Sequence, residues 1–240
     1  MSALEAARIA RLSDSAYYIP DFITEDEESK LLQKINSVPP PRWTQLSHRR
    51  LQTWPSTLSK SNTLLSAPLP AWLQDPIIHP RLEALGCFAD SPHQGPNHVL
   101  INEYQPGQGI MPHEDGPAYY PLVVTVSIGA PIVLDIYEKS GGGEESGCLD
   151  RTPRFRVLQE PRSLLITTAG LYTQYLHGIE ERLRDEELGR EGICNWELLG
   201  NAKVYSAGFY DRKTRISLTY RDVLKVAKVG NSMRFLTAGR

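Results

Sequence analysis

His113 and Asp115 stand two positions apart in the short polar stretch HEDG, between two apolar runs. In a strand, successive side chains point to opposite faces, so these two residues project to the same side and can bind one ion. His177, which ends an alternating run and precedes a glycine, is a third candidate ligand. Two histidines and one carboxylate suit a non-haem Fe(II) site that activates dioxygen. The alternative is structural, with His-x-Asp in a surface turn and His177 in the core.

Arg215 and Arg221 lie on one face of the run RISLTYR, together with Ser217 and Thr219. Two arginines that point the same way repel each other unless they meet anions. A dicarboxylate removes this conflict, because guanidinium groups bind carboxylates through two parallel hydrogen bonds. The alternative is the outward polar face of an edge strand. Two further polar residues either hydrogen-bond the same ligand or simply fill a strand, namely Asn102 and Tyr104.

The candidate residues lie in strand-like runs, and the sequence pattern of the second half of the chain predicts a β-rich scaffold around them. After residue 97, short β-branched and aromatic runs recur between Gly and Pro turns, which is typical of a sandwich or small barrel. One run, 171–179, is predicted as a strand that leads to the distal histidine. Two insertions interrupt the series. We expect 139–154 to form a surface loop, and 180–201, charged and helix-prone at its start, to pack outside the sheets.

The N-terminal part predicts one helix. Thr24 and Glu27 are spaced as a capping box, and the helix that follows must stop before the prolines at 39–41.

Length, charge and cysteine content set further bounds. A chain of 240 residues fits one large domain. The net charge of −2 excludes the overall basic field of proteins that coat DNA, so any nucleic-acid contact must be local. Three widely spaced cysteines without a C-x-x-C pair fit a reducing compartment. Because the chain has no signal-like or membrane-spanning apolar run, we expect a soluble intracellular protein without membrane contact. We also expect a monomer in the cytoplasm and nucleus.

The segment from Val38 to Leu73 contains no Asp or Glu, and its arginines alternate with tryptophans. Such side chains can neutralise phosphates and stack bases, as in proteins that bind single strands. Alternatively, the tryptophans anchor the core and the arginines form a solvated rim. The candidate substrate residues are Arg42, Trp43, Arg49, Arg50 and Trp54. A second basic set, which either holds a nucleic-acid backbone or keeps the C-terminus soluble, comprises Arg212, Lys213, Lys225, Lys228, Arg234 and Arg240.

The order of these motifs resembles the AlkB family of Fe(II)/2-oxoglutarate dioxygenases, and within it the AlkB homologue six branch. N-x-Y is followed by H-x-D eleven residues after the Asn, then by a distal His, then by R-x-[NS]-x-T-x-R. The stretches HVLINEYQPGQGIMPHEDGPAYYP, EPRSLLI and WTQLSHRRLQTW also look like that branch. The resemblance runs from about Tyr17 to Arg221, outside the two insertions and the basic tail. Together the motifs are specific, because each constrains residue type, order and spacing.

The resemblance implies a mainly β fold with a double-stranded β-helix (jelly-roll) core over 97–225. An N-terminal helix and a nucleotide-recognition lid, packed on that core, would occupy 1–96, and a basic tail 226–240. Fe(II), 2-oxoglutarate and O2 are the implied cofactor and co-substrates, with His113, Asp115 and His177 as catalytic iron ligands. The residues implied to bind 2-oxoglutarate are Asn102, Tyr104, Arg215, Ser217 and Arg221. Ser217 departs from the asparagine usual in the bacterial enzyme, which puts one hydrogen bond in question.

The implied reaction hydroxylates a C–H bond while 2-oxoglutarate becomes succinate and CO2. On an N-alkylated base of DNA or RNA, single-stranded or flipped out of a duplex, this removes the alkyl group, a methyl group leaving as formaldehyde. Two alternatives stay open. One is a dioxygenase for a protein side chain or a small molecule, and the other is a catalytically weak module that binds nucleic acid or protein on the same fold.

Overall fold

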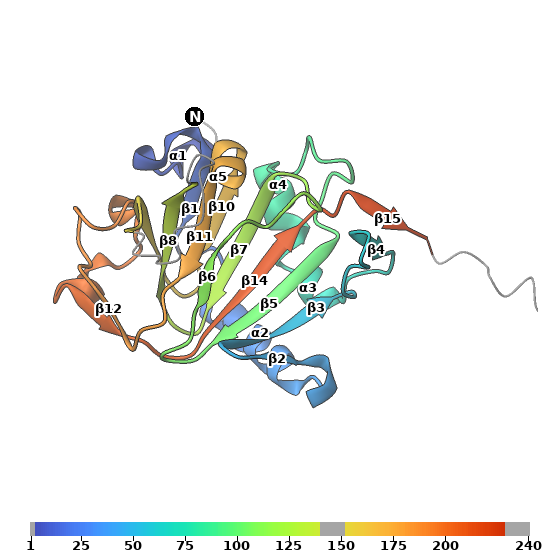
Figure 1. Ribbon diagram of the computed structural model, residues 1–240, viewed down its shortest axis with the longest axis horizontal. Coiled ribbons are helices and arrows are strands. Elements are labelled where there is room, and N and C mark those ends of the chain that lie inside the picture. Colours follow the sequence, from blue (N-terminus) through green and yellow to red (C-terminus); the bar gives the residue numbers. More distant parts are fainter. Residues whose placement is uncertain (1–2, 140–151, 229–240) are drawn as a thin grey trace, which may run out of the picture.

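A computed structural model describes residues 3–139 and 152–228, and two sheets dominate it (Figure 1). The seven-stranded large sheet contains, in spatial order, β1 (Ala16–Ile19), β10 (Leu164–Thr168), β7 (Leu122–Ile128), β14 (Arg215–Arg221), β5 (His98–Tyr104), β3 (Arg49–Trp54) and β2 (Thr44–Leu46). The four-stranded small sheet contains β6 (Ile110–His113), β11 (Tyr175–Ile179), β8 (Ile132–Glu138) and β9 (Phe155–Gln159). This is the mainly β sandwich that the spacing of the strands predicted.

Smaller elements surround the two sheets. Two short pairings join β12 (Arg184–Glu186) to β13 (Phe209–Asp211) and β4 (Thr63–Leu65) to β15 (Lys225–Ala227). The helical segments are α1 (Ala3–Ala6), η1 (Ala10–Ser15), α2 (Glu25–Ser37), η2 (Pro40–Arg42), α3 (Ala71–Gln74), η3 (Ile77–Leu82), α4 (Glu83–Leu85), α5 (Ala169–Gln174), η4 (Trp196–Leu198) and η5 (Ala202–Tyr205). In the described part of the chain, none of these helices has the length and apolar character needed to span a bilayer.

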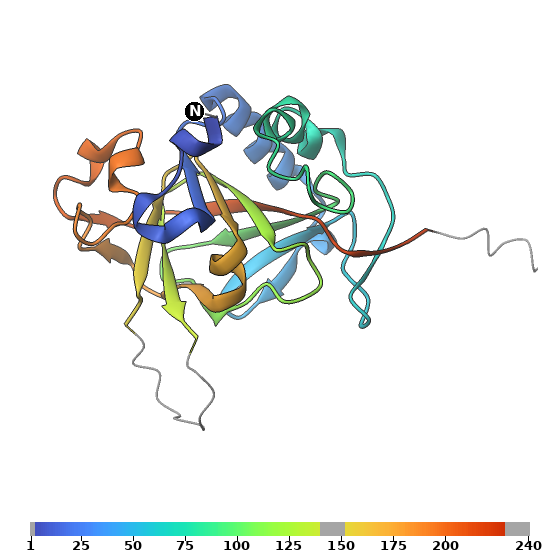
Figure 2. The ribbon, with the colours of Figure 1, turned by 90° about the horizontal axis from the view of Figure 1, so that it is seen from above.

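The main core lies between the large sheet and α2, α3 and α4, which gather on one side of it (Figure 2). Along β14, Ile216, Leu218 and Tyr220 point into this core, where they join Leu31 and Ile35 of α2. Each such buried side chain contributes about 1.5–3 kcal/mol relative to exposure. The alternate residues of β14 therefore face the opposite side. Because β14 is flanked by β7 and β5, it is not an edge strand, and the alternative of an outward polar face is excluded.

The capping box predicted for α2 is confirmed. The backbone N–H of Glu27 donates to the Thr24 side chain (3.2 Å), and the Glu27 carboxylate accepts from the Thr24 N–H (2.8 Å). Arg81 also donates to the Glu27 carboxylate at 2.9 Å, which ties the start of α2 to η3.

One helix propensity is overridden, and one predicted strand is partly wrong. The segment 180–201 contains no α-helix but β12 and η4, since Leu188 and Ile193 pack on Val133 and Leu158 of the small sheet. This packing, outside the sheets, is as predicted, and it overrides local helix propensity. The first half of 171–179 forms α5, because the chain must turn from β10 in the large sheet to β11 in the small one. Only the second half is the predicted strand.

Most of the loop predicted at 139–154 lies outside the described residues. The boundaries proposed for the lid, the core and the tail stay predictions.

Candidate active site

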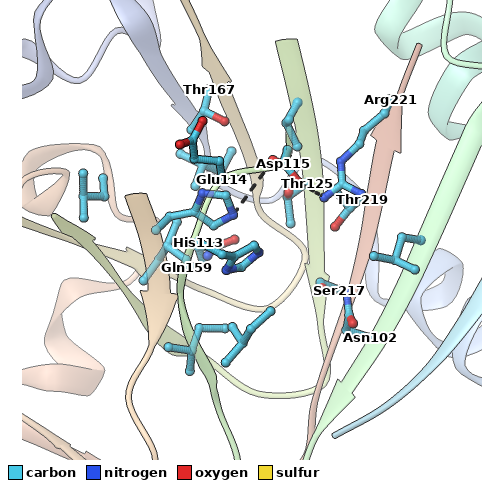
Figure 3. Close-up of a pocket in the computed structure, with 18 of the residues that line it drawn as sticks. Asn102, His113, Glu114, Asp115, Thr125, Gln159, Thr167, Ser217, Thr219 and Arg221 are labelled. Carbon is cyan, nitrogen blue, oxygen red and sulfur yellow. Dashed lines mark hydrogen bonds and ion pairs between the residues drawn. The ribbon is translucent and has the colours of Figure 1, made fainter. Parts of the chain in front are cut away.

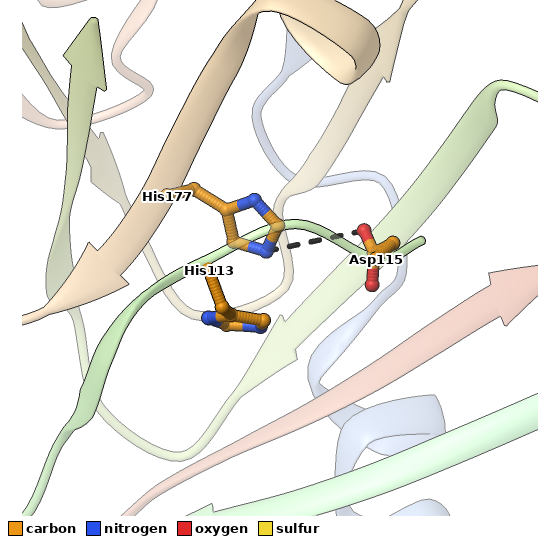
Figure 4. A group of neighbouring side chains, drawn as sticks. All are labelled: His113, Asp115 and His177. Atoms are coloured by element: carbon orange, nitrogen blue, oxygen red, sulfur yellow. Dashed lines mark ion pairs between the residues drawn. The ribbon is translucent and has the colours of Figure 1, made fainter. Parts of the chain in front are cut away.

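His113, Asp115 and His177 come together between the two sheets (Figure 4). His113 ends β6 and pairs in register with His177 of β11, so their ring centroids lie 4.4 Å apart. Asp115 follows β6 in a loop, and one of its oxygens lies 3.9 Å from Nε2 of His177. One potential ligand atom from each residue lies within 4.8 Å of the others. The structure thus assembles the three residues that the sequence singled out.

Both imidazoles can offer a ring-nitrogen lone pair to a metal ion. Nδ1 of His113 lies 2.8 Å from the Met111 carbonyl oxygen, which fixes the proton on Nδ1 and leaves Nε2 as the acceptor. Desolvation in the pocket, reinforced by the nearby His113 and Arg221, lowers the pKa of His177 to about 4 although Asp115 opposes the shift. His177 is therefore neutral near pH 7. Two imidazoles and a carboxylate are a donor set that fits a divalent iron ion.

Arg221 at the end of β14 holds the carboxylate of this cluster. Its Nη2 donates to Oδ1 of Asp115, and both side chains are nearly buried. The Arg221 guanidinium also lies 4.9 Å from the ring centroid of Tyr119. One Asp115 oxygen is thus engaged by Arg221, while the other faces His177.

Arg215, at the other end of β14, has no carboxylate partner among the described residues. Together with the triad it lines a cavity of about 290 Å3 between the sheets, drawn in Figure 3. Arg215 is 3% exposed, its Nη2 donates to Ser127 Oγ (2.8 Å) and Gln159 Oε1 (3.1 Å), and its buried Nε has no hydrogen-bond partner in the described structure. Burial lowers the pKa of Arg215 to about 10, so the side chain stays charged near neutral pH. A buried cation with neutral partners fits an anionic ligand such as the carboxylate of 2-oxoglutarate.

The other residues predicted to bind 2-oxoglutarate line the same cavity. Tyr104 and Asn102 of β5 lie in register with Arg215 and Ser217 of β14, and all four face the pocket. The Arg215 guanidinium lies 5.6 Å from the Tyr104 ring centroid. The strand alternation seen in the sequence therefore places both sets of polar side chains on one surface.

Of the predicted substrate residues, Arg49 lines the pocket. It belongs to β3, and its Nε donates to Asn102 Oδ1 at 3.2 Å.

The other four predicted substrate residues are not brought to this pocket. Arg50 pairs in register with Glu103, on the face opposite Asn102, and forms two 2.7 Å hydrogen bonds with the Glu103 carboxylate. Its guanidinium lies 4.1 Å from the Trp43 ring centroid. On that same face Trp54 packs against the main core, and Arg42 lies 3.9 Å over its ring. The alternative reading of tryptophans as core anchors thus describes Trp43 and Trp54.

The second basic set is also divided by the fold. Arg212 is buried and donates to both Asp185 oxygens, at 2.9 and 2.7 Å, so it holds β12 in place. Lys213, Lys225 and Lys228 are exposed. Arg234 and Arg240 lie outside the described residues.

Sequence reasoning missed three polar residues beside or within the site, namely Ser127, Gln159 and His98. Ser127 and Gln159 contact Arg215 from β7 and β9. His98, on β5 opposite Arg221, is 2% exposed, and neither of its ring nitrogens has a hydrogen-bond partner among the described residues. The period-two pattern of β5, in which His98 precedes Asn102 and Tyr104 on one face, was the available signal.

We predict that His98 makes stability depend on pH. Burial and the nearby Arg221 lower the pKa of His98 to about 4 from its ordinary value of 6.5. Between these values the unfolded chain binds a proton that the folded chain does not, so stability falls as pH falls through this window. His98→Phe removes the effect and should reduce the acid-induced loss of unfolding free energy by about 3 kcal/mol. Urea unfolding across the window measures it, and parallel pH profiles for the two proteins would contradict the assignment.

Comparison with known proteins agrees with this geometry. The model of the 2OG-Fe(II) oxygenase superfamily matches residues 15–221. The Danio rerio protein named "Probable RNA/DNA demethylase ALKBH6" is 41% identical over 227 residues, which cover 94% of this chain and 92% of that protein. An uncharacterised protein, L905 of Acanthamoeba polyphaga mimivirus, is 30% identical over 86% of this chain and 84% of its own length.

Solved structures support the fold. A 2OG-Fe(II) oxygenase family oxidoreductase from Burkholderia pseudomallei matches 90% of this chain and 88% of its own, with a TM-score of 0.55 and 11% identity. The structure of OsALKBH1 matches 87% of this chain and 96% of its own, with a TM-score of 0.51 and 13% identity. At such identities the likeness concerns the fold alone, and it confirms the predicted jelly roll.

The resemblance to AlkB proteins is confirmed by the relative at 41% identity, and the predicted use of Fe(II), 2-oxoglutarate and O2 by the family match together with the assembled triad. Since the family match spans most of the chain and contains every residue of the triad, this chain belongs to the 2OG-Fe(II) oxygenase superfamily.

Proposed function

We propose that the protein oxidatively removes an alkyl group from a nitrogen of a nucleic-acid base. In this proposal His113, Asp115 and His177 hold Fe(II), and Arg215 with Tyr104 binds the distal carboxylate of 2-oxoglutarate. Asn102 and Arg221 lie near its metal-binding end. The observation that carries the proposal is that one pocket joins a cluster of two histidines and one carboxylate to a buried cation without a carboxylate partner in the described structure.

Bound iron and 2-oxoglutarate supply the oxidising power that inserts one oxygen atom of O2 into a substrate C–H bond. The chain supplies position and environment. Arg221 orients the Asp115 carboxylate, and the Met111 carbonyl fixes the tautomer of His113. The apolar lining, which includes Leu134, Ile136 and Leu171, limits access of water.

Two features support a base as the substrate. Tyr119 and Tyr172 line the pocket beside Asp115, and Tyr172 is fixed there by a 2.6 Å hydrogen bond from its hydroxyl to the Gly116 carbonyl. Aromatic faces next to the metal cluster suit a planar ring, since bases stack on such side chains. The name of the Danio rerio relative, probable RNA/DNA demethylase, also supports a base as the substrate.

The test is oxidation of methylated oligonucleotides. With Fe(II), 2-oxoglutarate and O2, pools of methylated single-stranded DNA and RNA should raise the rate of succinate formation. The amount of formaldehyde released should equal the amount of additional succinate. Binding should also weaken steeply between about 50 and 200 mM salt, because phosphate contacts release counterions. Pools of the same sequences without methyl groups are the control.

Each other outcome selects a different function. Slow succinate formation that no oligonucleotide stimulates would contradict the demethylase and favour a protein side chain or small molecule as substrate. Oligonucleotide binding without any succinate would indicate a binding module. A monomeric state and a cytoplasmic and nuclear location stay predictions.

A further inference from the structure

Gln159 lies where the two sheets meet at the Arg215 end of the pocket. It is the last residue of β9 in the small sheet, is 2% exposed, and is drawn among the pocket-lining residues in Figure 3. Its Oε1 accepts hydrogen bonds from Arg215 Nη2 (3.1 Å) and from Ser127 Oγ (3.2 Å). Gln159 thus links the small sheet to β14 and β7 of the large one.

The orientation of the Gln159 amide follows from its partner. Every nitrogen of a guanidinium is a donor, so the amide atom that faces Arg215 must be the oxygen. The Nε2 group then carries two N–H donors directed away from Arg215. Among the residues the structure describes, none accepts a hydrogen bond from Nε2, and the Gln159 side chain lines the cavity. This donor is therefore available to a ligand.

For its effect on Arg215, the lack of charge on the Gln159 side chain matters as much as its position. Arg215 is enclosed by Ser127, Gln159 and Tyr104, which hydrogen-bond or stack with the guanidinium without neutralising it. A glutamate at position 159 would have nearly the same shape, but its carboxylate would pair with Arg215 directly. A buried cation that already has a carboxylate partner gains little from a second anion.

We propose that Gln159 is a co-substrate-binding residue, whose Oε1 holds the Arg215 guanidinium in place and whose Nε2 donates to the distal carboxylate of 2-oxoglutarate. The proposal rests on the use of 2-oxoglutarate by this protein, but on no particular substrate. It also makes Gln159 a determinant of specificity, since a donor fixed at the Arg215 end of the pocket favours a dicarboxylate over a 2-oxo acid without a distal carboxylate.

The experiment measures 2-oxoglutarate binding to the full chain loaded with redox-inert Mn(II), by calorimetry and without any substrate. Gln159→Glu should weaken 2-oxoglutarate binding at least about 100-fold, because the new carboxylate occupies Arg215. The same variant should melt about 2–4 °C higher than wild type, since the buried cation gains a partner. Gln159→Leu, which loses both hydrogen-bonding roles, should weaken binding about 10-fold without a gain in stability.

Two controls separate this role from general damage to the fold. Oxalate can chelate the metal but has no distal carboxylate, so its affinity should be equal in wild type and both Gln159 variants. Gln52 is fully buried on the other face of the large sheet, where Nε2 donates to the Ile35 carbonyl. Gln52→Leu should lower the melting temperature and leave 2-oxoglutarate affinity unchanged.

The proposal fails if Gln159→Glu binds 2-oxoglutarate within about threefold of wild type, or if oxalate affinity falls as much as that of 2-oxoglutarate. Wild-type protein that binds 2-oxoglutarate but demethylates nothing would contradict the proposed substrate and leave the role of Gln159 intact. Wild-type protein that does not bind 2-oxoglutarate would overturn both.

Discussion

His113→Ala is expected to reduce turnover at least about 100-fold, because loss of a direct metal ligand exceeds the 10–100-fold effect of losing a residue that only orients one. The folded structure should persist, since the His113 side chain is partly exposed and its one hydrogen bond in the described structure is to the Met111 carbonyl. Succinate formation gives the rate, and a melting curve without metal gives the stability.

His79 offers a matched control for this experiment. It is an exposed histidine in η3 that pairs with Glu83, remote from the cavity residues. His79→Ala should retain wild-type turnover and iron content. Equal turnover in His113→Ala and wild type would remove His113 from the metal site.

Asp115→Ala is a less clean test than the sequence suggested. From the sequence we expect loss of turnover with the fold intact, but the structure pairs Asp115 with the buried Arg221. Removing the carboxylate leaves a buried guanidinium without its partner, which costs about 3–5 kcal/mol of stability. Inactivity of Asp115→Ala therefore mixes loss of a metal ligand with partial unfolding, whereas His113→Ala separates them.

Arg215→Met is expected to raise the KM for 2-oxoglutarate about 100-fold or more, since two hydrogen bonds to a charged group contribute about 1.5–3 kcal/mol each. Stability of the metal-free protein should not fall much, because an apolar side chain replaces a buried cation that has no carboxylate partner. Initial rates at varied 2-oxoglutarate, together with urea unfolding, measure both effects. An unchanged KM would remove Arg215 from the co-substrate site.

The Arg212→Met variant is expected to give the opposite result, although Arg212 is buried to a similar extent. Its guanidinium is as buried as that of Arg215 but is paired with Asp185. Arg212→Met should cost about 3–5 kcal/mol of stability and leave the KM for 2-oxoglutarate unchanged in the folded protein. Lys213→Met, at an exposed position beside it, should change neither quantity.

The sequence determined the identity of the chemistry. His113 and Asp115 could be paired on one face from strand alternation alone, and β14 could be divided into a polar and an apolar face for the same reason. The division of β14 holds, because a strand buried on both sides leaves each side chain only two directions. His113 and Asp115 do converge, but Asp115 lies in the loop after β6, so strand alternation is not what brings its carboxylate to the cluster. The capping box of α2 is also local, since Thr24 and Glu27 satisfy each other within one turn.

Contacts between residues that lie far apart along the chain were decided by the tertiary structure. Gln159 is 56 residues from Arg215, and nothing in its own neighbourhood marks it as a partner of that arginine. The contact exists because β9 and β14 belong to different sheets that meet at one end of the pocket. The helix propensity at the start of 180–201 was overridden for a related reason, since the apolar side chains in this segment cover the small sheet.

The segment around Arg49 and Arg50 shows most clearly what the sequence determines and what the tertiary structure decides. The sequence presents two adjacent arginines near tryptophans, and composition cannot tell them apart. The pairing of Arg50 with Glu103 and of Leu51 with Asn102 places Arg49 on the pocket face and Arg50 on the core face. A shift of one residue in this register would exchange the two roles, because side chains alternate with a period of two. The sequence therefore determined which residues can do chemistry, and the register between strands decided which of them reach the site.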